Sequence, residues 1–265
     1  MFKQRPVLVS GPPRYIAVPL RAVGGFFEFV AQTAAASIRR PFHRDELVDQ
    51  AWFIARVSIV PTLLVAIPFT VLVSFTLNIL LREIGAADLS GAGVAFGSVT
   101  QVGPIVTVLI VAGAGATAIC ADLAARTIRE EIDAMRVLGI DPVRRMVVPR
   151  VLASTLVALL LNGLVCTIGI LGGYVFSVYL QGVNPGAFVN GITLLTGLSE
   201  LVISEVKAGL FGMIAGLVAC FLGLNVRGGA KSVGEAVNQT VVFAFMALFV
   251  VNVVVTAVGV ELTRK

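Results

Sequence analysis

The sequence predicts an all-α integral membrane protein: an amphipathic N-terminal helix at the membrane interface, then five transmembrane helices, with a short cytoplasmic helix joining the second span to the third. The 265 residues are 57% apolar and only 13% charged, whereas a soluble domain carries roughly 25% charged residues. Long runs without charge alternate with charged clusters, and residues 122–150 alone hold 11 of the 35 charged side chains. We expect one domain over residues 1–265.

Residues 14–40 carry an amphipathic pattern. Ile16, Leu20, Val23 and Phe27 recur at helical spacing, but Glu28 interrupts the apolar run. This pattern predicts a helix that lies in the interface, and a sixth span is the alternative. Residues 1–13 have no apolar core long enough for a removable signal peptide.

The transmembrane helices are predicted from the charge-free runs, because about 20 apolar residues cross the hydrocarbon core. The predicted spans are residues 57–81, 94–120, 151–180, 201–224 and 241–260. Pro61 and Pro68 are expected to bend the first span, since a membrane helix tolerates proline when neighbouring helices support it.

The loops between these spans are expected on alternating sides of the membrane. Residues 82–93 and 181–199 would form external loops, the second with a short helix, and residues 227–235 an internal loop. Eight Lys and Arg residues precede the first span, six lie between residues 122 and 150, and two lie in the internal loop. Basic residues accumulate on the cytoplasmic side, so we expect a cytoplasmic N-terminus.

A helix is predicted over residues 128–138, inside the charged segment. Thr127 is expected to cap it, with Glu130 completing a capping box, and Gly139 to end it, with Asp141 and Pro142 turning the chain away. Its charged side chains are Glu130, Glu131, Asp133 and Arg136. One apolar and one charged face suit a helix that docks on a partner protein, and lying flat on the membrane is the alternative.

The sequence carries no recognisable nucleotide-binding, metal-binding or catalytic motif. Residues 228–232 resemble the end of a nucleotide-binding loop, but Ala230 and Asn225 stand where that loop needs glycine. Three widely spaced cysteines and one histidine predict neither a metal site nor a disulfide framework. We expect no catalytic residue, and the clustered basic residues do not form the continuous face of a nucleic-acid binder.

Polar side chains inside the spans are the candidates for a substrate pathway, because charge at membrane depth is costly and usually functional. They are Gln101, Glu200, Glu205 and Lys207. Alternatively, the glutamates lie at headgroup level and Gln101 joins two helices. A gradient-driven secondary transporter that uses Glu205 and Lys207 remains a competing function, and a structural scaffold is a third.

The charged segment also carries a family resemblance. Residues 130–135 (EEIDAM), 139–142 (GIDP) and 147–150 (VVPR) resemble the signature of the MlaE/YrbE family. The resemblance implies a permease subunit of an ABC transporter in a bacterial plasma membrane. It would work with MCE-domain proteins and move lipid or another hydrophobic substrate across the cell envelope, with import as the expected direction. The resemblance implies no cofactor in this chain, since ATP and magnesium would bind to a separate ATPase dimer.

By the same resemblance, residues 128–138 form the coupling helix, with Glu130, Glu131, Asp133 and Arg136 facing the ATPase and Gly139, Asp141 and Pro142 shaping the turn. Two stretches depart from the family. Ala114 stands where arginine is common, and residues 122–124 (DLA) replace Glu-Leu-Gly. These departures indicate the actinobacterial YrbE kind, in which two different permease paralogues pair.

Overall fold

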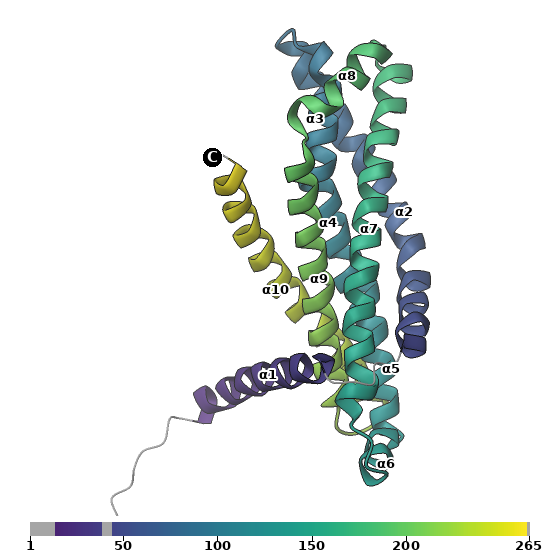
Figure 1. Ribbon diagram of the computed structural model, residues 1–265, viewed down its shortest axis with the longest axis vertical. Coiled ribbons are helices and arrows are strands. Elements are labelled where there is room, and N and C mark those ends of the chain that lie inside the picture. Colours follow the sequence, from purple (N-terminus) through teal and green to yellow (C-terminus); the bar gives the residue numbers. More distant parts are fainter. Residues whose placement is uncertain (1–13, 39–43, 264–265) are drawn as a thin grey trace, which may run out of the picture.

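The computed structural model describes residues 14–38 and 44–263, and every regular element in this part of the chain is a helix. Five helical stretches are long and apolar enough to cross a membrane: Arg44–Glu83, Ala87–Ile128, Val143–Leu180, Leu198–Leu224 and Ala230–Gly259. The prediction of five spans is therefore confirmed. The N-terminal helix runs across the direction of the bundle, as an interfacial helix would (Figure 1).

The helices have the following bounds: α1 Arg14–Ile38, α2 Arg44–Glu83, α3 Ser90–Gly97, α4 Gly103–Ile110, α5 Ala116–Ile128, α6 Glu131–Val137, α7 Val148–Val175, α8 Pro185–Leu195, α9 Leu198–Leu224 and α10 Ala230–Thr263. Four π-helical segments interrupt or extend the second and third spans: Ser98–Val102, Val111–Gly115, Val143–Val147 and Phe176–Leu180. Such segments are rare and occur often at functional sites.

Most spans extend beyond the residues that hydropathy marks. Helix α2 begins at Arg44 rather than residue 57, and the expected external loop 82–93 is already helical from Ala87. Charged residues near a helix end can reach the interface while the backbone stays helical, so the loss of hydropathy does not end the helix. Helix α8 occupies the loop where a short helix is expected.

Helix α7 packs between α2 and α9. The face that α2 buries is a stripe of small side chains spaced four residues apart, among them Ser58, Thr62, Ala66 and Thr70. On α9, a Cβ atom at Gly212 would lie 2.5 Å from the backbone oxygen of Ser154. Small residues at these crossings let the helices approach closely, which is how membrane helices associate.

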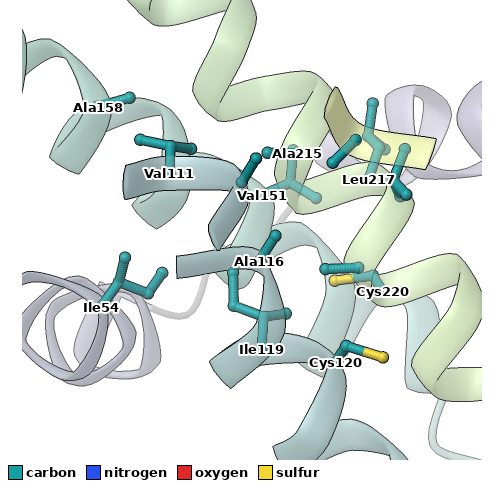
Figure 2. Close-up of a cluster of buried hydrophobic side chains, with 14 of the residues drawn as sticks. Ile54, Val111, Ala116, Ile119, Cys120, Val151, Ala158, Ala215, Leu217 and Cys220 are labelled. Carbon is teal, nitrogen blue, oxygen red and sulfur yellow. The ribbon is translucent and has the colours of Figure 1, made fainter. Parts of the chain in front are cut away.

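The largest hydrophobic cluster lies where α2, α5, α7 and α9 meet, with Ile54, Ile119, Val151 and Ala215 among its fully or nearly buried members (Figure 2). Cys120, Cys166 and Cys220 are free and buried, so they serve as small core residues. Helix α1 docks beside this region through Phe26 and Phe29, whose rings lie 5.4 and 5.6 Å from that of Phe221 on α9.

Two short helices mark the two ends of the molecule. Helix α6 projects beyond the bundle at one end, and α8 crosses over α3 at the other (Figure 1). Helix α10 leans away from the other spans (Figure 1). Of its most apolar 18-residue segment, only 11% is buried within this chain. Most of the α10 surface is thus free to meet lipid or another subunit.

Candidate functional site

The helix in the charged segment is shorter than predicted. Helix α6 covers seven residues, Glu131–Val137, and Ile128 belongs to the end of α5. The predicted capping box is wrong: the hydroxyl of Thr127 donates to the carbonyl oxygens of Leu123 (2.9 Å) and Gly223 (3.2 Å). Glu130 instead adopts a left-handed conformation with φ 60°, which ends α5 and turns the chain into α6.

The predicted end of this helix is confirmed. Gly139 has φ 75°, its amide donates to the carbonyl of Arg136 (3.0 Å), and the amide of Ile140 donates to that of Met135 (2.9 Å). This is the pair of bonds of a Schellman motif. Asp141 follows, and its side chain accepts a hydrogen bond from the amide of Val143 (3.0 Å), so it caps the helical stretch that leads into α7.

The exposed surface of α6 combines apolar and charged groups. Ile132 is 2% exposed and anchors the helix, whereas Val137 and Leu138 are 87% and 74% exposed. Beside them, Arg136 donates to Asp133 over 2.8 Å. The helix therefore does not present the expected single apolar face: Ile132 packs inward, and the exposed apolar surface consists of Val137, Leu138 and Ile140 at the tip.

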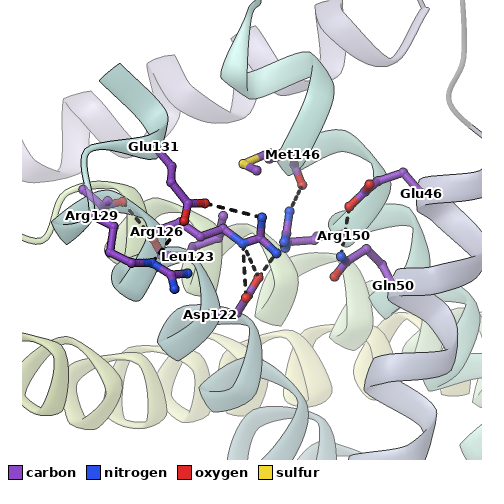
Figure 3. A network of polar contacts seen from close by, with 10 residues as sticks. Glu46, Gln50, Asp122, Leu123, Arg126, Arg129, Glu131, Met146 and Arg150 are labelled. Atoms are coloured by element: carbon purple, nitrogen blue, oxygen red, sulfur yellow. Dashed lines mark hydrogen bonds and ion pairs between the residues drawn. The ribbon is translucent and has the colours of Figure 1, made fainter. Parts of the chain in front are cut away.

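A chain of ion pairs joins the start of α6 to the bundle (Figure 3). Arg150 is fully buried, and its Nη2 lies 2.6 Å from Oδ2 of Asp122. The Nε of Arg126 lies 3.2 Å from the other oxygen of Asp122. Glu131, at the start of α6, then pairs with Arg126 at 3.7 Å and Arg129 at 3.1 Å. Glu131 is thus bound within this chain as well as being a candidate contact for a partner.

A second candidate site lies between the spans. Gln101, Glu200 and Lys207 line one cavity of about 270 Å³, between the π-helical segment Ser98–Val102, α9 and α10. Lys207 is only 3% exposed, while Glu200 accepts hydrogen bonds from the Gly197 amide (2.8 Å) and the Ser199 hydroxyl (3.0 Å) at the start of α9. Three of the four pathway candidates therefore come together in the fold.

A larger cavity of about 480 Å³ shares two of its lining residues, Phe96 and Gln101, with the first. Its other lining residues come from α2, α3, α4 and the end of the π-helical segment Ser98–Val102, and they are apolar or glycine, apart from Thr76. A cavity that holds a buried lysine among several polar side chains thus adjoins an almost wholly apolar one, which matches the two parts of an amphiphile.

Glu205, the fourth pathway candidate, lies apart from the other three. It lines a separate apolar groove between α7 and α9, and its Oε1 accepts a hydrogen bond from Asn162 Nδ2 (3.1 Å). Positions 205 and 207 are two residues apart, so they point to different sides of α9. A single site built from Glu205 and Lys207 is therefore not present in this conformation.

Several site residues escape the sequence analysis. Thr100, Ser204 and Thr256 add hydroxyl groups to the cavity of Lys207, and hydroxyls in a membrane helix carry no distinctive pattern. The Asp122–Arg150 pair was detectable in part, because the two residues border the charged segment on opposite sides. Within residues 14–38 and 44–263, no group of three His, Cys, Asp or Glu side chains could hold a metal ion.

Five apolar spans, a short exposed helix beyond one end and a cavity with buried polar side chains between the spans are the features of a multi-pass membrane permease. The family described as permease MlaE matches residues 47–258, and the chain belongs to this family. A probable ABC transporter permease of Rickettsia conorii is 31% identical over 243 residues, which cover 89% of this chain and 91% of that protein.

Two further relatives extend the comparison. A probable ABC transporter permease of Synechocystis is 33% identical over 168 residues, covering 63% of this chain and 64% of the relative. The intermembrane phospholipid transport system permease protein MlaE of Haemophilus influenzae is 27% identical over 241 residues, covering 90% and 92%. The chain is thus similar to ABC transporter permeases along nearly its whole length.

Proposed function

We propose that this permease is the membrane subunit of an ATP-driven lipid transporter in a bacterial plasma membrane. The observation that carries the proposal is α6, which projects from the bundle with exposed apolar and charged side chains and is tied by ion pairs to the helices that cross the membrane. A separate ATPase dimer would bind ATP and magnesium, and its movement would reach the spans through α6.

The surface of α6 fits a protein better than it fits a membrane. Val137 and Leu138 stand beside the charged groups of Asp133 and Arg136, whereas a helix lying on lipid separates apolar and charged faces. Mixed apolar and charged side chains are typical of the core and rim of a protein interface. Glu130 and Asp133 would contribute to the charged rim.

The α6 end is the proposed cytoplasmic end. Six Lys and Arg residues lie between residues 122 and 150, and Arg227 and Lys231 lie between α9 and the first turn of α10. The region of α8, residues 181–199, has no Lys or Arg. This difference follows the positive-inside rule and supports an external α8 and a cytoplasmic N-terminus.

The proposed cargo is a lipid with an anionic headgroup. Lys207 would attract a phosphate or carboxylate, Gln101 would donate hydrogen bonds, and the adjoining apolar cavity would accept an acyl chain. The Haemophilus relative is named for phospholipid transport, which supports this class of cargo. Replacing Lys207 with methionine should lower transport of an anionic phospholipid while the complex still assembles.

The proposed assembly contains a second permease, a paralogue by the departures at Ala114 and Asp122, together with MCE-domain proteins, and it works in the direction of import. The exposed apolar surface of α10 offers a contact area, within the membrane, for the second permease. The direction and the MCE partnership rest on the family resemblance.

Co-purification from the native host tests the proposal. We expect an ATPase, a second permease and MCE-domain proteins in fixed ratio with the tagged chain. Changing both Glu130 and Asp133 to lysine should release the ATPase and stop transport without unfolding the permease. A stable protein that transports lipid without any ATPase would contradict the proposal and return attention to a gradient-driven carrier.

A further inference from the structure

Five side chains of alternating charge form a continuous path from the interior of the bundle to α6. The path runs Arg150, Asp122, Arg126, Glu131, Arg129, with successive N–O distances of 2.6, 3.2, 3.7 and 3.1 Å (Figure 3). It begins on α7, crosses α5 and ends around the first residue of α6. These contacts join elements on both sides of α6 in the chain.

The path has a further attachment to α9. Thr127, one residue after Arg126, donates to the carbonyl of Gly223 near the end of α9 (3.2 Å). A Cβ atom at Gly223 would lie 2.9 Å from the Cβ of Leu123, so α5 and α9 are in close contact there. Helices α5, α7 and α9 are therefore held together where the path passes between them.

Stability alone does not account for the buried end of the path. Arg150 is 0% exposed, and its Nε has no hydrogen-bond partner. The guanidinium binds only Asp122 and the carbonyl of Met146 (3.0 Å) among the contacts of the described residues. Burying an ion pair costs desolvation energy that often equals or exceeds the attraction, so an apolar pair would hold these helices together at least as well.

The sharp turns at the two ends of α6 give the ion pairs a mechanical role. Glu130 before α6 and Gly139 after it both adopt left-handed conformations, so each end of this seven-residue helix is a sharp turn. The main apolar anchor of α6 is Ile132. Without the ionic contacts of Glu131, a force applied to α6 could rotate it about these turns instead of moving the spans.

We propose that Arg126, together with the Asp122–Arg150 pair, forms the link that transmits movement of α6 to α5 and α7. Arg126 is the central positioning residue, because its guanidinium contacts two carboxylates: that of Glu131 on α6, and that of Asp122 one turn earlier on α5, which binds Arg150 on α7. The inference rests on the proposed docking of an ATPase on α6. The side chains that transmit movement to the spans are then different from those on which the ATPase docks.

The test compares Arg126→Gln with Lys231→Gln in the complete transporter reconstituted in vesicles that contain fluorescent phospholipid. Arg126 is 33% exposed, so its neutral replacement leaves no buried charge unpaired. Lys231 pairs with Glu235 at 4.0 Å within α10 and is 93% exposed. The control thus also removes one positive charge from an ion pair, but both partners of that pair lie on the same helix.

The quantity measured is lipid moved per ATP hydrolysed. We expect Arg126→Gln to lower it by about ten-fold, within the range typical of coupling between sites, while the ATPase still co-purifies and hydrolyses ATP. Arg126→Lys should restore part of the loss, because it keeps a positive charge between the two carboxylates, and Lys231→Gln should match the wild type. A purely structural role would lower assembly and both rates together.

Two results would overturn the inference: wild-type transport per ATP in Arg126→Gln, or loss of the ATPase from that variant, which would place Arg126 in the docking surface instead. The double variant Asp122→Asn/Arg150→Gln, which removes the buried charges together, should reproduce the uncoupling. The proposed docking is tested separately by the Glu130 and Asp133 lysine variant. If that variant kept its ATPase, docking on α6 would fail whatever Arg126 does.

Discussion

The two ends of the molecule hold their short helices in different ways. At the α8 end, α8 lies against α3 in direct backbone contact, and a Cβ atom at Gly91 would fall 1.9 Å from the carbonyl oxygen of Phe188. At the α6 end, ion pairs join α6 to α5 and α5 to α7, with Arg126 in the middle. One short helix is fixed by close packing, and the other by ion pairs together with one buried apolar side chain, Ile132.

This difference has a mechanical meaning. Backbone packing at van der Waals distance allows little movement, because any shift produces a clash or a void. Ion pairs between long side chains tolerate small displacements, since the attraction changes gradually with distance. The α8 end is therefore suited to close the bundle, and the α6 end to receive and pass on movement.

The largest effect is expected from Gly91→Val. The added side chain would overlap the backbone of Phe188 and should separate α8 from α3, at a cost of about 4 kcal/mol, above the usual range for overpacking. Thermal unfolding of the purified protein in detergent would measure the loss. Gly234→Ala is the matched control, because a Cβ there meets nothing within 4 Å. Equal stability of the two variants would show that α8 is loosely held.

The second largest loss of stability is expected at the α6 end, from variants of the Asp122–Arg150 pair. Asp122→Asn leaves the fully buried Arg150 without a counter-charge and should destabilise the protein by about 3 kcal/mol. Arg150→Met should cost less, because Asp122 is 29% exposed and keeps Arg126. The same unfolding measurement compares the two. A larger loss in Arg150→Met would mean that packing around the arginine, rather than charge balance, holds this end.

The sequence predicts the spans well because hydropathy depends on solvent and not on tertiary contacts. Predicted spans such as residues 57–81 and 151–180 carry no charge and must avoid water wherever the helices end. The ends themselves are less predictable, as Arg44 at the start of α2 shows. Backbone hydrogen bonds continue a helix past the point where its side chains become polar.

The sites are predicted only in part. Glu200 and Lys207 share a face of α9 by their spacing, but the contribution of Gln101 to the same cavity depends on how two spans pack. The break between α5 and α6 contains no glycine or proline from which it could be predicted. The Asp122–Arg150 contact joins residues 28 positions apart, so it arises from tertiary structure and not from a local pattern.

The smallest expected effect concerns strain at the two ends. Near α8 the left-handed turn position is taken by Gly182 (φ 67°), whereas before α6 it is taken by Glu130 (φ 60°), which is the only non-glycine residue with positive φ among the described residues. A residue with a side chain loses roughly 1 kcal/mol in this conformation. Glu130→Gly should therefore raise the free energy of unfolding by up to about 1 kcal/mol.

The matched control for this strain is Gly139→Ala at the other end of α6, where φ is 75° and a Cβ would meet nothing within 4 Å. It should lower stability by about 1 kcal/mol, because alanine disfavours the left-handed conformation that glycine adopts freely. If Glu130→Gly gave no gain while Gly139→Ala gave the loss, the Glu130 side chain would be stabilising its own turn. A gain would instead show that the chain keeps a strained residue at the end that moves, as strained residues tend to persist at functional positions.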